Sequence, residues 1–159
     1  MLRIFTPDYR VRSLDEISAE FLRSQGARGV IADLDNTLAL PADPAPTGAA
    51  IAWLREMHES GIGIVVLSNA SRARVAAFCD PLGLDFICRG GKPLTRGFKK
   101  AAALLGLPIR EIIILGDQVF TDVLGARVAG MKSALIAPIT IEGGWFFRAK
   151  RALERWVTG

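Results

Sequence analysis

Three continuous apolar runs, each followed at once by polar side chains, constrain the fold of this chain more than any other feature. They are the segments GVIADLD, IGIVVLSNA and EIIILGD, which begin at Gly29, Ile62 and Glu111. Such runs are typical of strands buried on both faces of a parallel sheet. Helix-like segments separate them, and this alternation indicates βαβ units. The sequence therefore predicts an α/β fold, a Rossmann-like three-layer sandwich around a parallel sheet.

The segments around these runs predict the remaining elements. We expect further strands at residues 85–89 and 132–138. We expect helices at residues 13–26, 47–61, 71–80, 94–106 and 120–131, with Ser13, Thr47 and Ser71 as N-caps. A chain of 159 residues, half of them hydrophobic, is the size of one domain with one core. We therefore expect a single domain over residues 1–159, with a basic aromatic segment at residues 143–159.

Polar side chains follow each apolar run at its carboxyl end. They are Asp33, Asp35 and Thr37 after the first run, Ser68 and Asn69 after the second, and Asp117 and Asp122 after the third. Lys92 lies in the loop RGGKPL, just after the weaker strand at residues 85–89. In a parallel sheet the carboxyl ends of the strands share one edge, where ligands bind. We therefore expect all four sets to meet at one site.

The residue types in these sets point to phosphoryl transfer. Asp33 and Asp35 are costly neighbours at the end of a buried strand unless a cation or a shared proton relieves their repulsion. Carboxylate and backbone oxygens suit Mg²⁺, and Mn²⁺ would accept the same ligands. One carboxylate can attack phosphorus while a second protonates the leaving oxygen. A hydroxyl, backbone amides and a lysine would neutralise the equatorial phosphoryl oxygens.

Some of these residues also have ordinary structural explanations. Ser68 and Asn69 could cap a helix. Lys92 could be a solvated loop lysine, and Asp122 could favour the start of a helix. The pair Asp33 and Asp35 is the hardest set to explain without a function.

The motifs DLDNT, LSNAS, GGKP and GDQVFTD resemble, in order and spacing, the four motifs of the haloacid dehalogenase (HAD) superfamily. The resemblance covers nearly the whole chain and implies a HAD-like fold. It implies that Asp33 is the nucleophile and a Mg²⁺ ligand, and that Asp35 is the general acid/base with its backbone carbonyl on the metal. Asp117 would complete the metal shell, while Asp122 would bind it through water or orient Lys92. The residues implied in phosphate binding are Ser68, Asn69, Lys92 and Thr37.

Two features refine this resemblance. Many members have Gly where this chain has Asn36, but Asn tolerates unusual backbone angles better than most residues, so activity is still expected. The acid at Asp35 favours a phosphatase, because dehalogenase relatives lack it. The intervals at residues 39–61 and 70–91 leave no room for the cap domain that many members carry. We therefore expect a capless enzyme of subclass III, with an open site that suits a large or surface-presented substrate.

The C-terminal segment GGWFFRAKRALERWVTG combines aromatic and basic side chains. This combination is typical of an interfacial helix on anionic lipid, and residues 145–156 would make that contact. A helix that docks its aromatic side chains on the sheet, with its basic face in water, explains the segment equally well.

This tail, the opening MLRIFTPDYRVRSL and the segment GDQVFTDVLGA make the chain resemble the capless YqeG family, which is similar to the mitochondrial phosphatidylglycerophosphatases. The resemblance implies Mg²⁺-dependent conversion of phosphatidylglycerophosphate to phosphatidylglycerol through an aspartyl-phosphate. A phosphoprotein, a nucleic-acid end or a soluble phosphate ester is the alternative substrate. A phospho-acceptor signalling module or an inactive scaffold is the alternative of another class. The module is disfavoured because the second strand ends in Ser68 and Asn69 rather than in an acceptor Asp.

The bulk properties add little to these expectations. A net charge of +4 suits anionic partners, but no block of like charges is present and we expect no nucleic-acid partner. With no export signal and no apolar run long enough to cross a bilayer, we expect a cytoplasmic protein, peripheral at the inner face of the membrane if the tail binds lipid. Cys79 and Cys88 are expected to be small buried hydrophobes, and His58 a surface residue.

Overall fold

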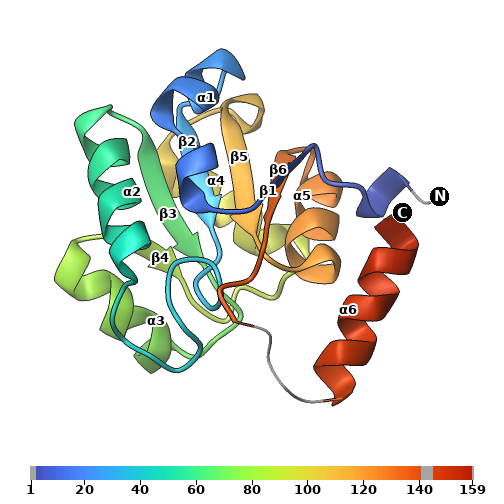
Figure 1. Cartoon of the computed structure of the whole chain (residues 1–159). Coiled ribbons are helices and arrows are strands. Elements are labelled where there is room, and N and C mark those ends of the chain that lie inside the picture. The colour runs from blue at the N-terminus through green and yellow to red at the C-terminus, as the bar shows by residue number, and fades with distance from the viewer. Residues whose placement is uncertain (1–2, 141–144, 159) are drawn as a thin grey trace.

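The computed structural model describes residues 3–140 and 145–158, and in the second range it describes the side chains of residues 149 and 151–156. Six strands form one parallel sheet in the order β1-β6-β5-β2-β3-β4 (Figure 1). The strands are β1 (Tyr9–Val11), β2 (Gly29–Ala32), β3 (Gly63–Leu67), β4 (Asp85–Ile87), β5 (Ile112–Gly116) and β6 (Lys132–Ile136). The α-helices are α1 (Ala19–Ser24), α2 (Gly48–Glu59), α3 (Arg72–Cys79), α4 (Thr95–Leu105), α5 (Leu124–Ala129) and α6 (Trp145–Thr158). The expected parallel α/β sandwich is confirmed.

Helices cover both faces of the sheet, because successive side chains of each strand point to opposite faces. In β2, Val30 and Ala32 face the core that α1, α2 and α3 cover. Ile31, between them, faces the second core, which α4 and α5 cover. All four residues of β2 are buried, as expected for the middle of a parallel sheet. No domain is inserted at the carboxyl edge within residues 3–140, where the predicted absence of a cap is confirmed.

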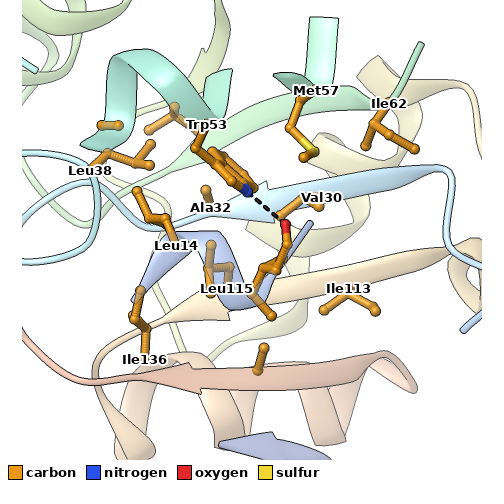
Figure 2. Close-up of a cluster of buried hydrophobic side chains, with 14 of the residues drawn as sticks. Leu14, Val30, Ala32, Leu38, Trp53, Met57, Ile62, Ile113, Leu115 and Ile136 are labelled. Atoms are coloured by element: carbon orange, nitrogen blue, oxygen red, sulfur yellow. Dashed lines mark hydrogen bonds between the residues drawn. The ribbon is translucent and has the colours of Figure 1, made fainter. Parts of the chain in front are cut away.

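The expected single helix at residues 13–26 is wrong. A 3₁₀ turn (Leu14–Glu16) ends before Ser18, whose Oγ accepts from the Phe21 N–H (3.1 Å) and caps α1. Between the two, the Ile17 carbonyl accepts a hydrogen bond from Trp53 Nε1 (2.8 Å), which Figure 2 draws as the dashed line from the labelled Trp53. The Trp53 side chain of α2 is 2% exposed and packs in the core beneath this break. A long-range contact, which local propensity does not reveal, therefore divides the helix.

The other expected helices begin and end close to the predicted positions. Thr47 Oγ1 caps α2 by accepting from the Ala50 N–H (3.1 Å), and Ser71 Oγ caps α3 by accepting from the Arg74 N–H (3.3 Å). The helix expected at residues 120–131 begins instead with a π-helical turn, η5 (Val119–Val123), before α5. Strand β1 was not expected, because three residues give too short a pattern; it pairs with β6 at the sheet edge.

Helix α6 stands at one side of the molecule, next to the N-terminal 3₁₀ turn η1 (Arg3–Phe5) (Figure 1). No helix in the described ranges has the length and apolar character needed to span a lipid bilayer. Of the two thiols, Cys79 is buried and Cys88 only half-buried, and neither forms a disulfide. His58 is exposed, as expected.

Trp53→Phe tests the link between α2 and the helix break. Phenylalanine keeps an aromatic ring but leaves the buried Ile17 carbonyl without its donor, which costs about 1–3 kcal/mol of unfolding free energy. Urea denaturation would measure the loss. Trp156→Phe is the matched control, because Trp156 is 81% exposed and should cost almost nothing. Equal effects of the two substitutions would contradict this role of Trp53.

Candidate active site

The strand order places three of the polar sets side by side. Strand β2 lies between β5 and β3, so Asp33 emerges between Asp117, which follows β5, and Ser68, which follows β3. The Asp33 N–H donates to the Leu115 carbonyl (2.8 Å) and continues the ladder one residue past the strand. The site is therefore built directly on the rigid carboxyl edge of the sheet, as the sequence predicts.

Three carboxylates gather at this edge. Asp33, Asp117 and Asp122 are 8%, 1% and 2% exposed, and each offers one oxygen so that the three atoms lie within 4.8 Å of one another. Asp117 Oδ1 is buried without a hydrogen-bond partner in the described structure. An orphaned buried carboxylate oxygen inside an all-oxygen donor set is what a hard divalent cation requires. The residues present therefore fit the Mg²⁺ that the motifs imply.

Lys92 is the cation that faces these carboxylates. Its Nζ lies 2.7 Å from Asp33 Oδ1 and 2.6 Å from Asp122 Oδ1, and its side chain is 4% exposed. Burial by itself lowers the pKa of Lys92, but the carboxylates of Asp122 and Asp33 outweigh it and raise that pKa above its ordinary value. Lys92 is therefore a permanently charged ammonium inside the site. The prediction that Asp122 orients Lys92 agrees with this contact.

Two features hold the loop that carries Lys92 in place. Asn69 accepts from the Lys92 N–H (2.8 Å) and donates through Nδ2 to the Lys92 carbonyl (3.1 Å). Gly97 lets α4 approach this loop, because a Cβ at this position would lie 2.5 Å from the Gly90 carbonyl oxygen. Asn69 thus acts on the loop backbone, and its predicted direct role in phosphate binding remains a prediction.

Asp35 is not one of the three clustered carboxylates, and its side chain is 35% exposed. Arg74 of α3 donates to Asp35 Oδ1 through Nη2 (2.7 Å) and Nε (3.2 Å), and Nη2 also donates to the Leu40 carbonyl (3.2 Å). The acid expected to protonate the leaving group is therefore at the rim, held by an arginine. Arg74 was missed, because the sequence separation of 39 residues hides the contact.

The two predicted hydroxyl groups are both buried. Ser68 is 3% exposed, and its Oγ accepts from the Ala70 N–H (3.1 Å). The helix cap is Ser71, so Ser68 and Asn69 are not explained as capping residues. Thr37 is 1% exposed, and its Oγ1 has no hydrogen-bond partner among the described residues. Ser68 follows β3, which pairs with β2, and Thr37 lies in the loop that follows Asp33. Their contacts with phosphate remain predictions.

Asn36 adopts the backbone conformation for which glycine is usual, with φ of 62°. Its N–H donates to the Ala39 carbonyl (2.8 Å), which closes the loop after Asp33. Its side-chain Oδ1 accepts from the Thr140 N–H (3.0 Å) and hydroxyl (2.8 Å). The expectation that Asn tolerates this backbone conformation is confirmed. Its side chain also binds Thr140 in the segment after β6, which Gly could not do.

The segment after β5 brings Asp122 back to the site. Asp122 Oδ2 accepts from the Gln118 N–H (3.1 Å). A Cβ on Gly116 would lie 2.3 Å from Asp122 Oδ2, so only glycine permits this approach. The π-helical turn η5 carries Asp122, and such turns often occur at functional sites.

Burial sets the electrostatics of the cluster. It raises the pKa of Asp33 above its ordinary value, although Lys92 opposes the shift. Burial, together with the charges of Asp33 and Asp122, raises the pKa of Asp117 from 3.8 to about 7, against the opposing guanidinium of Arg151. A bound cation would lower the pKa of both Asp33 and Asp117, because carboxylates bind a metal ion in their deprotonated form.

One more contact to the cluster was not expected. Arg151 of α6 donates to the Asp117 carbonyl and to Asp117 Oδ2. The sequence treats Arg151 as part of a basic face, whereas the structure places it on a candidate metal ligand. The predicted membrane contact through residues 145–156 falls partly outside the described side chains, which exclude those of Trp145, Phe146, Phe147, Arg148 and Lys150.

Comparison with known proteins agrees with the motifs. The sequence model of haloacid dehalogenase-like hydrolases matches residues 9–130, so the chain belongs to this family of hydrolases. It is 36% identical over 153 residues to the Bacillus subtilis (strain 168) protein named Probable phosphatase YqeG, covering 96% of this chain and 89% of that one. The expected resemblance to the HAD superfamily and to YqeG is confirmed.

Two further similarities are more distant. The chain is 27% identical over 148 residues to Phosphatidylglycerophosphate phosphatase 1, chloroplastic, of Chlamydomonas reinhardtii, covering 86% of this chain and 55% of that protein. The match thus spans about half of that relative's length. A haloacid dehalogenase-like hydrolase from Brucella suis 1330 has the same fold, with a TM-score of 0.53, 13% identity and coverage of 80% and 92%.

The raised pKa of Asp117 predicts how the stability of the metal-free protein depends on pH. Between pH 3.8 and about pH 7 the Asp117 carboxyl binds more protons in the folded protein than in the unfolded chain, so its contribution to the unfolding free energy falls as the pH rises. Asp117→Asn removes this contribution and should flatten the dependence. Urea denaturation in EDTA at about pH 5 and about pH 8 measures both slopes. Equal slopes for wild type and variant would contradict a raised pKa at the buried Asp117 carboxyl.

Proposed function

We propose that this chain is a Mg²⁺-dependent phosphatase that cleaves a phosphate monoester through an aspartyl-phosphate on Asp33. One observation carries the proposal. The Asp33 carboxylate is buried against a charged lysine within a cluster of three carboxylates, while Asp35, two residues on, is at the rim. A nucleophile inside and an acid/base outside are the two parts that such a reaction needs.

In the first step, an Asp33 oxygen attacks phosphorus and the bond from phosphorus to the ester oxygen breaks. Asp35 gives its proton to that oxygen as the alcohol leaves. Both bonds that Arg74 makes to Asp35 go to Oδ1, and no described hydrogen bond reaches Oδ2. Arg74 can therefore fix the Asp35 carboxyl while Oδ2 carries the proton.

In the second step, Asp35 takes a proton from water, whose oxygen attacks the same phosphorus. The bond between phosphorus and the Asp33 oxygen breaks, which releases phosphate and restores the carboxylate. Lys92, Ser68 and backbone amides of the loops would hold the phosphoryl oxygens. Asp33, the Asp35 carbonyl and Asp117 would hold Mg²⁺, with Asp122 beside it; when bound, the ion supplies positive charge for the non-bridging oxygens.

For the substrate, we propose the phosphate monoester of a membrane lipid, phosphatidylglycerophosphate, with phosphatidylglycerol as the product. The name of the Chlamydomonas reinhardtii relative supports this choice. The open carboxyl edge supports it too, because a lipid headgroup presented on a bilayer cannot enter a closed pocket. The protein would then act from the cytoplasm at the inner face of the membrane.

Exposed apolar side chains around the site fit such a surface. Leu94 is 70% exposed two residues after Lys92, and Leu40 is 36% exposed beside the Arg74 contact. Ile139 is 42% exposed, and its N–H donates to the Asn36 carbonyl (3.2 Å). Three large apolar side chains on three loops of one edge would insert at a lipid interface. On α6, Trp156 at 81% exposed suits the same role.

Phosphate release from phosphatidylglycerophosphate in anionic vesicles with Mg²⁺ tests the proposal, with Asp33→Asn as the inactive variant. Asparagine cannot form the phosphoenzyme, so release should fall to background while the protein stays folded by circular dichroism. Wild-type-like turnover of Asp33→Asn would refute the nucleophile. Release from soluble esters alone would retain the phosphatase and refute the lipid substrate. No Asp33-dependent release from any phosphate ester would refute the phosphatase.

Leu94→Ser tests the lipid surface without weakening the fold. Leu94 is the N-cap residue of α4 and makes no side-chain cap, so serine should add one. We expect vesicle binding and turnover of the lipid to fall several-fold, because one leucine side chain is no longer buried in the bilayer. Turnover of a soluble ester should not change. Leu104→Ser, at the other end of α4 and 49% exposed, is the control and should change neither activity. Equal losses on both substrates would contradict this surface.

A further inference from the structure

Helix α6 reaches the metal-binding cluster through one side chain. Arg151, whose side chain is 30% exposed, donates through Nη1 to the Asp117 carbonyl and through Nη2 to Asp117 Oδ2. The same carboxylate keeps Oδ1 buried without a hydrogen-bond partner in the described structure. The arginine therefore binds one face of Asp117 and leaves the other face for the cation.

A second residue of α6 fixes the arginine and the next segment of the site. Glu154 is 4% exposed, which is rare for a carboxylate without a specific partner. Its Oε2 lies 3.6 Å from Arg151 Nη1, and its Oε1 accepts from the Val119 N–H (3.2 Å). Val119 opens the π-helical turn that carries Asp122. The two residues of α6 thus contact Asp117 and Val119, which both lie in the segment that leads to Asp122.

We propose that Arg151 is a positioning residue of the metal site, which orients Asp117 so that Oδ1 faces the cation, and that Glu154 anchors it. Helix α6 lies beyond residue 130, where the match to the hydrolase family model ends, and within a chain of which the YqeG match covers 96%. The proposal rests on the metal-dependent function above. It also opposes a simpler possibility, that Arg151 takes the place of the cation and must leave when the metal binds.

These two possibilities predict opposite changes in metal affinity when Arg151 is replaced. Hydrogen-bond partners of metal ligands typically change metal affinity by about 10–100-fold when they are removed. If Arg151 orients Asp117, Arg151→Gln should weaken metal binding by about that factor, because Asp117 loses its fixed rotamer. If Arg151 competes with the cation, the same substitution should tighten binding.

The test is a titration of the whole chain, residues 1–159, with Mn²⁺ alone, in which free Mn²⁺ is followed by electron paramagnetic resonance. We expect Arg151→Gln to raise the Mn²⁺ dissociation constant about 10–100-fold, and Arg151→Lys to recover part of the loss because a positively charged donor remains. Arg155→Gln, on the exposed side of α6, is the matched control and should bind as wild type does. Unfolding in EDTA verifies that each variant is folded.

The outcomes separate this inference from the proposed function. Unchanged or tighter Mn²⁺ binding by Arg151→Gln would overturn the positioning role and leave the metal site intact. Equal weakening by Arg151→Gln and Arg155→Gln would also overturn it, because the effect would then be general charge loss. Failure of the wild-type protein to bind Mn²⁺ would overturn both the inference and the metal-dependent function.

Discussion

The buried ammonium of Lys92 is the interaction on which the site depends. Three carboxylates within 4.8 Å of one another would repel strongly in a buried setting, and Lys92 binds two of them directly. Arg151 binds the third. Glu154, which lies against Arg151, adds a fourth carboxylate, so when all four are ionised the two positive groups leave an excess of negative charge that favours a further cation. That cation and Lys92 together would then attract a phosphate dianion, so one charge arrangement explains both ligands.

The sheet order converts distant parts of the chain into neighbours. Because β2 pairs with both β3 and β5, the loops after these three strands are adjacent, whatever lies between them in sequence. The covering helices then have two tasks. Their apolar faces fill the two cores, and the polar side chains at their ends reach the carboxyl edge. Arg74 of α3 and Arg151 of α6 are such side chains, and both contact acids of the site.

The sequence predicts the acids, the hydroxyl groups and the lysine that follow the strands, and it misses the arginines that α3 and α6 contribute. Asp33, Ser68 and Asp117 each follow a continuous apolar run. Such runs predict strands of a parallel sheet, whose carboxyl ends share one edge, so the three residues are expected to converge. Arg74 and Arg151 contact residues 39 and 34 positions away, and a basic residue on a helix carries no signal of its partner. The same limit explains the divided helix at residues 13–26, where Trp53 of α2 takes the Ile17 carbonyl. Contacts set by packing decide these features.

Crystals soaked in Mn²⁺ and measured for anomalous scattering would test the central claim most directly. The account predicts one strong peak at the carboxyl edge, coordinated by Asp33, the Asp35 carbonyl and Asp117 Oδ1, with Arg151 still on Asp117 Oδ2. Oxygen ligands at about 2.0–2.3 Å would identify the site as the one that the orphaned carboxylate oxygen implies. A peak elsewhere, or no peak at a Mn²⁺ concentration that supports turnover, would contradict a metal site built on these three residues.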